Sequence, residues 1–177
     1  MKILLPMLTL VFLMSCQTFT TIEINQSLKT KLESYGIDIT KVQFFNSSDI
    51  LLRRPISNEE MKSANGKITS VNNKFFEEIL IKKDTPCILV SATDDELVVQ
   101  FESGDDKKLH FVKTKKNNDC YKLNIDEIAT TGLVNNQIIY GSNKYTLGSS
   151  TECYLAIKQS TVTNEKKNRK IIHGLNL

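Results

Sequence analysis

Apolar and polar residues alternate with a period of two along most of the chain, which predicts β-strands. Short runs of this kind are separated by turn residues such as Asn, Asp and Gly. The predicted strands lie in "IDITKVQFF" (37–45), "DILLRR" (49–54), the two arms of "GKITSVNNKFFEEILIKK" (66–83), the three parts of "PCILVSATDDELVVQFESGDDKKLHFVK" (86–113), "YKLNI" (121–125), the two arms of "NQIIYGSNKYTL" (136–147) and "CYLAIK" (153–158). About ten short strands favour a mainly β fold, a small antiparallel barrel or sandwich.

Turn chemistry and alternation add detail to this prediction. Asn72 and Asn73 tolerate left-handed backbone conformations, and Gly141, Ser142 and Asn143 supply a second hairpin turn. The residues of segment 86–113 expected to face the core are Val90, Leu97, Val99, Phe101, Leu109 and Phe111. We expect one β-rich domain over residues 37–160, with room for two small sub-barrels.

One short N-terminal helix is predicted over residues 25–36, before the strands begin. Leu28, Leu32 and Tyr35 share one helical face, and Gly36 suits the C-terminus. Asn25 or Ser27 could cap the start. Three apolar residues make a narrow stripe, which we expect to dock on the domain rather than on lipid.

The first residues have the composition of a secretory signal peptide. Lys2 supplies a positive charge, and residues Ile3–Met14 form an apolar run interrupted by Pro6 and Thr9. That run is shorter than the roughly 20 apolar residues that cross a bilayer, and it fits the core of a signal peptide. An uncut anchor helix is the weaker interpretation.

The run ends in "LMSC", which resembles the lipobox of bacterial lipoproteins. Leu13, Ser15 and Cys16 match the Leu at −3, the small residue at −1 and the Cys at +1, whereas Met14 departs from the usual small residue. The resemblance implies signal cleavage between Ser15 and Cys16 and acyl chains on Cys16. Two or more acyl chains hold a protein stably on a membrane.

The residues after Cys16 bear on location. An Asp at the next position resembles an inner-membrane retention signal in enterobacterial lipoproteins, but this chain has Gln17 there. The tether over residues 16–24 also lacks an acidic cluster of the surface-export kind, since its first acid is Glu23. We therefore expect a protein anchored in the outer membrane of the cell envelope, facing the periplasm.

Charge is nearly balanced in the chain that cleavage would leave. Removing 15 of the 177 residues leaves 162, with 22 basic and 20 acidic side chains, which argues against a nucleic-acid-binding protein. The segment 161–177 is a basic tail without a clear period. Its charges at Lys166, Lys167, Arg169 and Lys170 could contact an anionic lipid surface, an acidic partner or the glycan wall. A disordered solubilising tail is the simpler interpretation.

Three cysteines remain besides Cys16, namely Cys87, Cys120 and Cys153. The envelope permits disulfides, but an odd number leaves at least one thiol free. Their spacing does not match a zinc site, so no metal is expected. Burial as small apolar residues is favoured for each; if one pair forms, Cys120 with Cys153 is expected.

Residues that could carry catalysis are sparse. His110 alternates outward and has no evident acidic partner, and His173 lies in the tail. Neither a nucleophile elbow nor a phosphate-binding loop is found, and the acidic turns around Asp94 and Asp106 are typical of solvated loops. A hydrolase would need distant residues, with His110 beside Cys87 or a distant Asp as its core.

Two further resemblances concern the domain. "DTPCILVSATDDELVVQFESGDDKKLHFVK" resembles the core of a Src-homology-3-like barrel. The order of "KVQFFNSSDILLRR", this hairpin, a Tyr-rich hairpin and a basic tail resembles uncharacterised small envelope lipoproteins of Bacteroidota-type bacteria. These resemblances imply a fold and a location but no activity.

We therefore expect a lipid-anchored, non-enzymatic binding or accessory module without a cofactor, which meets an envelope protein partner. The alternatives are a cell-wall-modifying or hydrolytic enzyme, and a barrel that binds a small ligand or metal.

Overall fold

A computed structural model describes residues 19–168, except residues 105, 116–117, 131–132 and 149–151. The predicted signal cleavage site, Arg169 and Lys170 lie outside the described residues. None of the helices formed by the described residues is long and apolar enough to cross a membrane.

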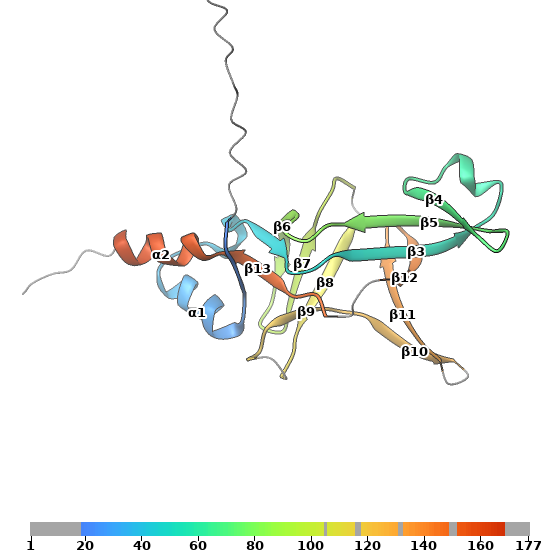
Figure 1. The fold of residues 1–177 in the computed structure, drawn as a ribbon. Helices are drawn as coiled ribbons and strands as arrows, with labels where there is room; N and C mark the ends of the chain where they lie inside the picture. Colours follow the sequence, from blue (N-terminus) through green and yellow to red (C-terminus); the bar gives the residue numbers. More distant parts are fainter. Residues whose placement is uncertain (1–18, 105, 116–117, 131–132, 149–151, 169–177) are drawn as a thin grey trace, which may run out of the picture.

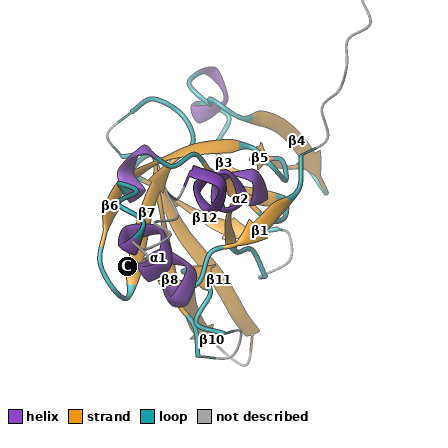
Figure 2. Ribbon diagram, turned by 90° about the vertical axis from the view of Figure 1, so that its left-hand side faces the viewer, coloured by secondary structure: helices purple, strands orange, loops and turns teal. Residues whose placement is uncertain are grey.

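The fold is mainly β, with two antiparallel sheets and two short helices (Figures 1 and 2). The first sheet contains, in spatial order, β1 (Thr21–Glu23), β13 (Leu155–Lys158), β2 (Phe44–Asn46), β6 (Pro86–Ala92), β7 (Glu96–Gln100), β8 (Lys108–Lys113) and β9 (Tyr121–Leu123). The second contains, in spatial order, β10 (Asp126–Thr130), β11 (Leu133–Tyr140), β12 (Asn143–Leu147), β3 (Ile50–Ile56), β5 (Lys74–Ile81) and β4 (Lys67–Val71).

The sheets are not closed into a barrel, so the barrel alternative is wrong. The two ends of the first sheet do approach each other. Two isolated bridges, Asn25 with Cys120 and Lys122 with Tyr154, join β9 to the other edge. Isolated bridges do not make a ladder, and β9 has only three residues with which to form one.

One hydrophobic core serves both sheets. Phe44, Leu97 and Phe111 of the first sheet and Ile50 and Leu52 of the second are fully buried in the same cluster. Of the residues predicted to face inward, Leu97, Val99, Leu109 and Phe111 are buried and Phe101 packs against the core. Such burial is the main stabilising contribution to a domain of this size.

Val90 was predicted to face the core but is 43% exposed. Cys87 and Leu89 take the inward positions of β6, so Val90 falls on the outer face. The pairing of β6 with β7 also shifts between Leu89 and Ser91, which is a β-bulge that the sequence did not reveal.

The predicted N-terminal helix is confirmed as α1 (Gln26–Ser34). Asn25 caps it, because its side chain accepts the backbone N–H of Leu28 at 2.8 Å. At the other end Gly36 adopts φ +76°, and the N–H of Ile37 donates to the carbonyl of Leu32. Leu32 is fully buried, so α1 docks on the domain as expected.

Two segments differ from the predicted elements. Residues Ile39–Lys41 form a 3₁₀ helix, η1, instead of the start of a strand, because the side chain of Asp38 accepts the N–H of Thr40 at 3.0 Å. The start of the basic tail forms a second helix, α2 (Gln159–Asn168), although its sequence has no helical period. Val162 packs against the core and attaches α2 to the domain.

A buried carboxylate organises the second sheet. Glu77 of β5 is 1% exposed, and its carboxylate accepts the Arg54 Nε at 2.7 Å and the Tyr145 hydroxyl at 3.1 Å. It also accepts the backbone N–H groups of Asn65 and Gly66 at 2.8 and 2.9 Å. These bonds satisfy the charge and hold the loop of the short 3₁₀ helix η2 (Glu60–Lys62) against the sheet.

Gly66 is required for this contact. A Cβ at that position would lie 2.6 Å from the carbonyl oxygen of Glu78 and 2.9 Å from the Cγ of Glu77. Only a residue without a side chain allows the backbone to approach the carboxylate so closely.

We expect Glu77→Gln to destabilise the protein by about 3 kcal/mol, because it removes the buried partner of Arg54, which then keeps only its pair with the more exposed Glu60. Burial alone would raise the pKa of Glu77, but the hydrogen bonds from Gly66, Arg54 and Asn65 hold it below its ordinary value. The stabilisation is therefore complete above the ordinary carboxyl pKa of about 4.3 and is lost as the pH falls through the folded-state value.

Glu78→Gln is the matched control, since it removes the neighbouring charge, which pairs with Arg53 at 3.1 Å, nearer the surface. That change should lower the free energy of unfolding by less than about 1 kcal/mol. Urea unfolding at pH 7 and at acid pH measures both effects. Equal losses for the two variants at pH 7 would contradict the role given to Glu77.

Candidate functional site

The sites predicted from sequence fall on separate parts of the chain. Ser15 and Cys16 precede the first described residue, Phe19. Lys166 and Lys167 belong to α2, whereas Arg169 and Lys170 follow it. The structure therefore tests neither the acylation site nor contact with an anionic surface.

The structure has Cys120 and Cys153 as free thiols, and not as the disulfide that was expected if one pair formed. Cys87, Cys120 and Cys153 are free thiols and are buried. Lys122 lies opposite Tyr154, and the N–H of Leu123 donates to the carbonyl of Cys153 at 2.8 Å. Cys153 therefore lies beside Leu123, three residues along the strand from Cys120, or about 10 Å, which is beyond the Cα separation of a disulfide.

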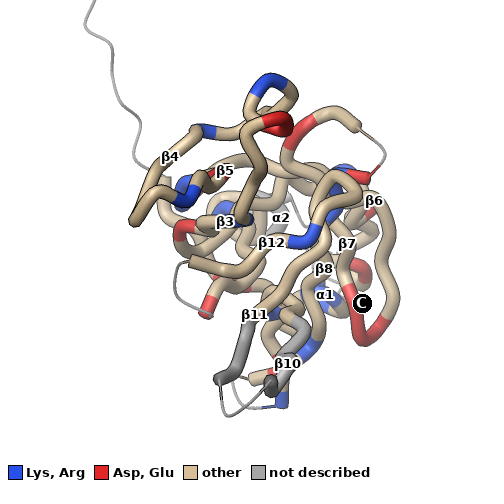
Figure 3. Tube along the Cα trace, turned by 90° about the vertical axis from the view of Figure 1, so that its right-hand side faces the viewer, with Lys and Arg blue, Asp and Glu red and all other residues tan. Residues whose placement is uncertain are grey.

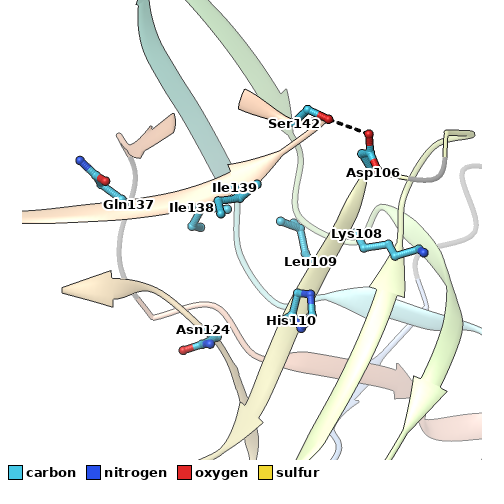
Figure 4. Close-up of a pocket in the computed structure, with 9 residues that line it drawn as sticks. All are labelled: Asp106, Lys108, Leu109, His110, Asn124, Gln137, Ile138, Ile139 and Ser142. Carbon is cyan, nitrogen blue, oxygen red and sulfur yellow. Dashed lines mark hydrogen bonds between the residues drawn. The ribbon is translucent and has the colours of Figure 1, made fainter. Parts of the chain in front are cut away.

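A cavity of about 500 Å³ opens between β8 of the first sheet and β11 of the second (Figure 4). The residues that line it are Asp106, Lys108, Leu109, His110, Asn124, Gln137, Ile138, Ile139 and Ser142. Its wall combines apolar side chains with acidic, basic and amide groups. A volume of this size is within the range of small-ligand sites.

Strand pairing explains the opening. β9 pairs with β8 only over Phe111–Lys113, which leaves the 108–110 edge of β8 beyond the ladder. β10 pairs with β11 only as far as Gln137, so the edge of β11 after Gln137 also lies beyond a ladder. Backbone bonds close the two ends, from Gly141 N–H to the Asp106 carbonyl at 3.0 Å and from Asn124 N–H to the His110 carbonyl at 2.7 Å.

His110 stands at one side of this cavity. Its side chain is 52% exposed, which confirms the outward direction predicted from alternation. The expectation that it lacks an acidic partner is wrong, because its Nδ1 lies 2.9 Å from the Glu96 carboxylate. Register creates the pair: Val98 lies opposite His110, so Glu96 is its diagonal neighbour. The sequence held no signal for this pair, because the loop between β7 and β8 leaves their register open.

The structure does not bring His110 together with Cys87. Cys87 is buried on the core face, whereas His110 points to the outer face. Burial, together with the nearby Cys153, raises the pKa of Cys87 to about 12, so the thiolate is scarce at neutral pH. The hydroxyl in the cavity, that of Ser142, donates to the Asp106 carboxylate at 2.6 Å. The described residues of the cavity thus contain no nucleophile aligned with the histidine.

The acidic turns serve as partners for other side chains. Asp94 pairs with the buried Lys29 at 3.2 Å, and Asp95 pairs with Lys113 at 2.6 Å. Asp106 accepts the bond from Ser142 and lies at the other end of β7, as hairpin geometry predicts. In the part of the chain that the structure describes, no cluster of three metal-ligating side chains occurs.

Comparison of the chain with family models, with curated proteins and with solved structures finds no match.

We expect the thiols of Cys87, Cys120 and Cys153 to be unreactive in the native protein, because burial raises the pKa of each. Iodoacetamide followed by peptide mass spectrometry should label all three in denaturant without prior reduction. Labelling of Cys120 and Cys153 only after reduction would show that they form a disulfide.

Proposed function

We propose that this chain is a lipid-anchored envelope lipoprotein that acts as a non-enzymatic binding or accessory module at the outer membrane, facing the periplasm. The observation that carries the proposal is the "LMSC" pattern, which ends at Cys16, directly before the folded domain. The anchor confines the domain to a surface and raises its effective concentration near other envelope proteins.

The cavity between β8 and β11 is the proposed binding site for the partner. Its rim contains Ile139, which is 59% exposed, beside polar groups such as His110 and Gln137. Apolar area flanked by a few polar groups is typical of recognition sites. Binding is favoured over hydrolysis because the described lining residues supply no aligned nucleophile.

A small ligand is the second candidate occupant, and the cavity volume favours it. Thermal shift measurements against metals and lipids would test this alternative. A wall-modifying enzyme has less support, since it depended on a pairing of His110 with Cys87 or a distant Asp, and His110 instead contacts Glu96.

For the fold, we propose that the antiparallel strands β6, β7 and β8 correspond to the core strands of a Src-homology-3-like fold, here without barrel closure. The support is the resemblance of residues 84–113, together with their consecutive pairing. Fold alone does not assign an activity.

The anchor is tested by metabolic labelling with an alkyne fatty acid and mass spectrometry of the N-terminal peptide. We expect the wild-type chain to begin at Cys16 with an acyl mass increment and to pellet with membranes. Cys16→Ala should lose the label because the acceptor sulfur is gone. Cys120→Ala, which removes a buried cysteine, should retain it. An unmodified wild-type N-terminal peptide would overturn the proposal.

The binding site is tested by placing a photo-crosslinking residue at Ile139 in cells. Ile88 is the matched control, because it is 62% exposed and lies on β6, outside the lining of this cavity. We expect a discrete envelope protein to be captured at Ile139 and not at Ile88. Capture of the same proteins at both positions, or of none at Ile139, would contradict a partner at this cavity.

A further inference from the structure

One end of the molecule carries α1, α2 and β1, and the β4–β5 hairpin lies at the opposite end (Figure 1). The described chain also begins at the α2 end. The ring of Phe19 packs 4.9 Å from the ring of Phe45, and the Nζ of Lys158 lies 4.6 Å from the Phe19 centroid. The N–H of Gln159, the first residue of α2, donates to the carbonyl of Thr20 at 2.9 Å. These contacts hold the start of the described chain against the N-terminus of α2.

Only a short stretch of chain separates these contacts from Cys16. Phe19 follows Cys16 by three residues, which span about 10 Å at full extension. An acyl chain on Cys16 would thus hold the domain directly against the bilayer, because no long flexible linker lies between them. The end that contains Phe19 must then face the membrane.

The charge of α2 suits this position. The helix contains Lys166 and Lys167 against a single acid, Glu165, and Lys158 directly precedes it. The acids of the neighbouring α1 region are paired within the domain: Glu33 with Lys29 at 3.6 Å and Asp38 with Lys41 at 3.5 Å. At the opposite end, around β3, β4 and β5, basic and acidic positions are interspersed (Figure 3).

We infer that the end formed by β1, β13 and α2 is a membrane-contact surface for anionic lipid headgroups, with α2 as its basic segment. The β4–β5 hairpin is directed away from the bilayer. The acyl chains on Cys16 hold the domain at the bilayer, and a basic segment beside them adds electrostatic attraction to anionic headgroups. The orientation rests on the proposed acylation of Cys16.

The test uses the acylated full-length protein, reconstituted into vesicles that contain a nitroxide headgroup lipid. A fluorophore is attached through Ser160→Cys on α2 or through Asn73→Cys in the β4–β5 turn, both exposed positions. In phosphatidylglycerol-containing vesicles we expect quenching to be at least threefold stronger at position 160. Equal quenching at the two positions would overturn the orientation.

Charge reversal tests the headgroup contact. Lys166→Glu with Lys167→Glu should reduce the quenching at position 160 by at least half. Lys67→Glu with Lys74→Glu, the same charge change at the far hairpin, should leave it unaltered. Unchanged quenching after reversal in α2, or equal quenching in phosphatidylcholine vesicles, would overturn the contact with anionic lipid and leave an acidic protein as the partner of α2.

The outcomes separate this inference from the proposed function. A protein whose N-terminal peptide is unmodified and that does not float with vesicles contradicts the anchor itself. A protein that is acylated and floats, but shows no preferential quenching at position 160, contradicts only the inferred membrane-contact surface.

Discussion

The side chain of Asn46 joins two of the connections through which the chain passes between its sheets, and the architecture depends on it. Asn46 is fully buried. Its Nδ2 donates to the carbonyls of Ser48 and Lys82, both at 2.8 Å, and its Oδ1 accepts the N–H of Thr85 at 2.9 Å. One amide thus satisfies backbone groups after β2 and after β5, where a buried and unpaired group would be costly. The connection that precedes β13 meets the other two here. The N–H of Ser47 donates to the carbonyl of Tyr154, and the N–H of Tyr154 donates to the Ser47 hydroxyl.

This junction explains both ends of the molecule. Strands β2 and β13 run from this junction to the end of the molecule where Phe19 and α2 are held by contacts with the domain. The edges of β8 and β11 that lie beyond their ladders leave the cavity between them. The proposed membrane-contact surface and the proposed binding cavity are formed by different elements, so the two proposals do not compete for one surface.

Local chemistry made much of the fold predictable. The Asn72–Asn73 turn has both residues at positive φ, 51° and 59°, as their side chains allow. The cap at Asn25 and the stop at Gly36 bound α1 within a residue or two of the expected limits. Elements whose formation depends on distant contacts were missed. The helix α2 has no helical period and is held by Val162 on a core that other segments build.

The sequence by itself determined what lies within a few residues of a given position: strands from alternation, and turns from residues that accept positive φ. Only the tertiary structure decided which strands are neighbours and in what register. That register sets Glu96 beside His110, separates Cys120 from Cys153, and brings Asn65 and Gly66 to the carboxylate of Glu77. The physical reason is that alternation has a period of two and assigns a residue to a face, whereas a shift along the neighbouring strand by two residues leaves every face unchanged and every partner different.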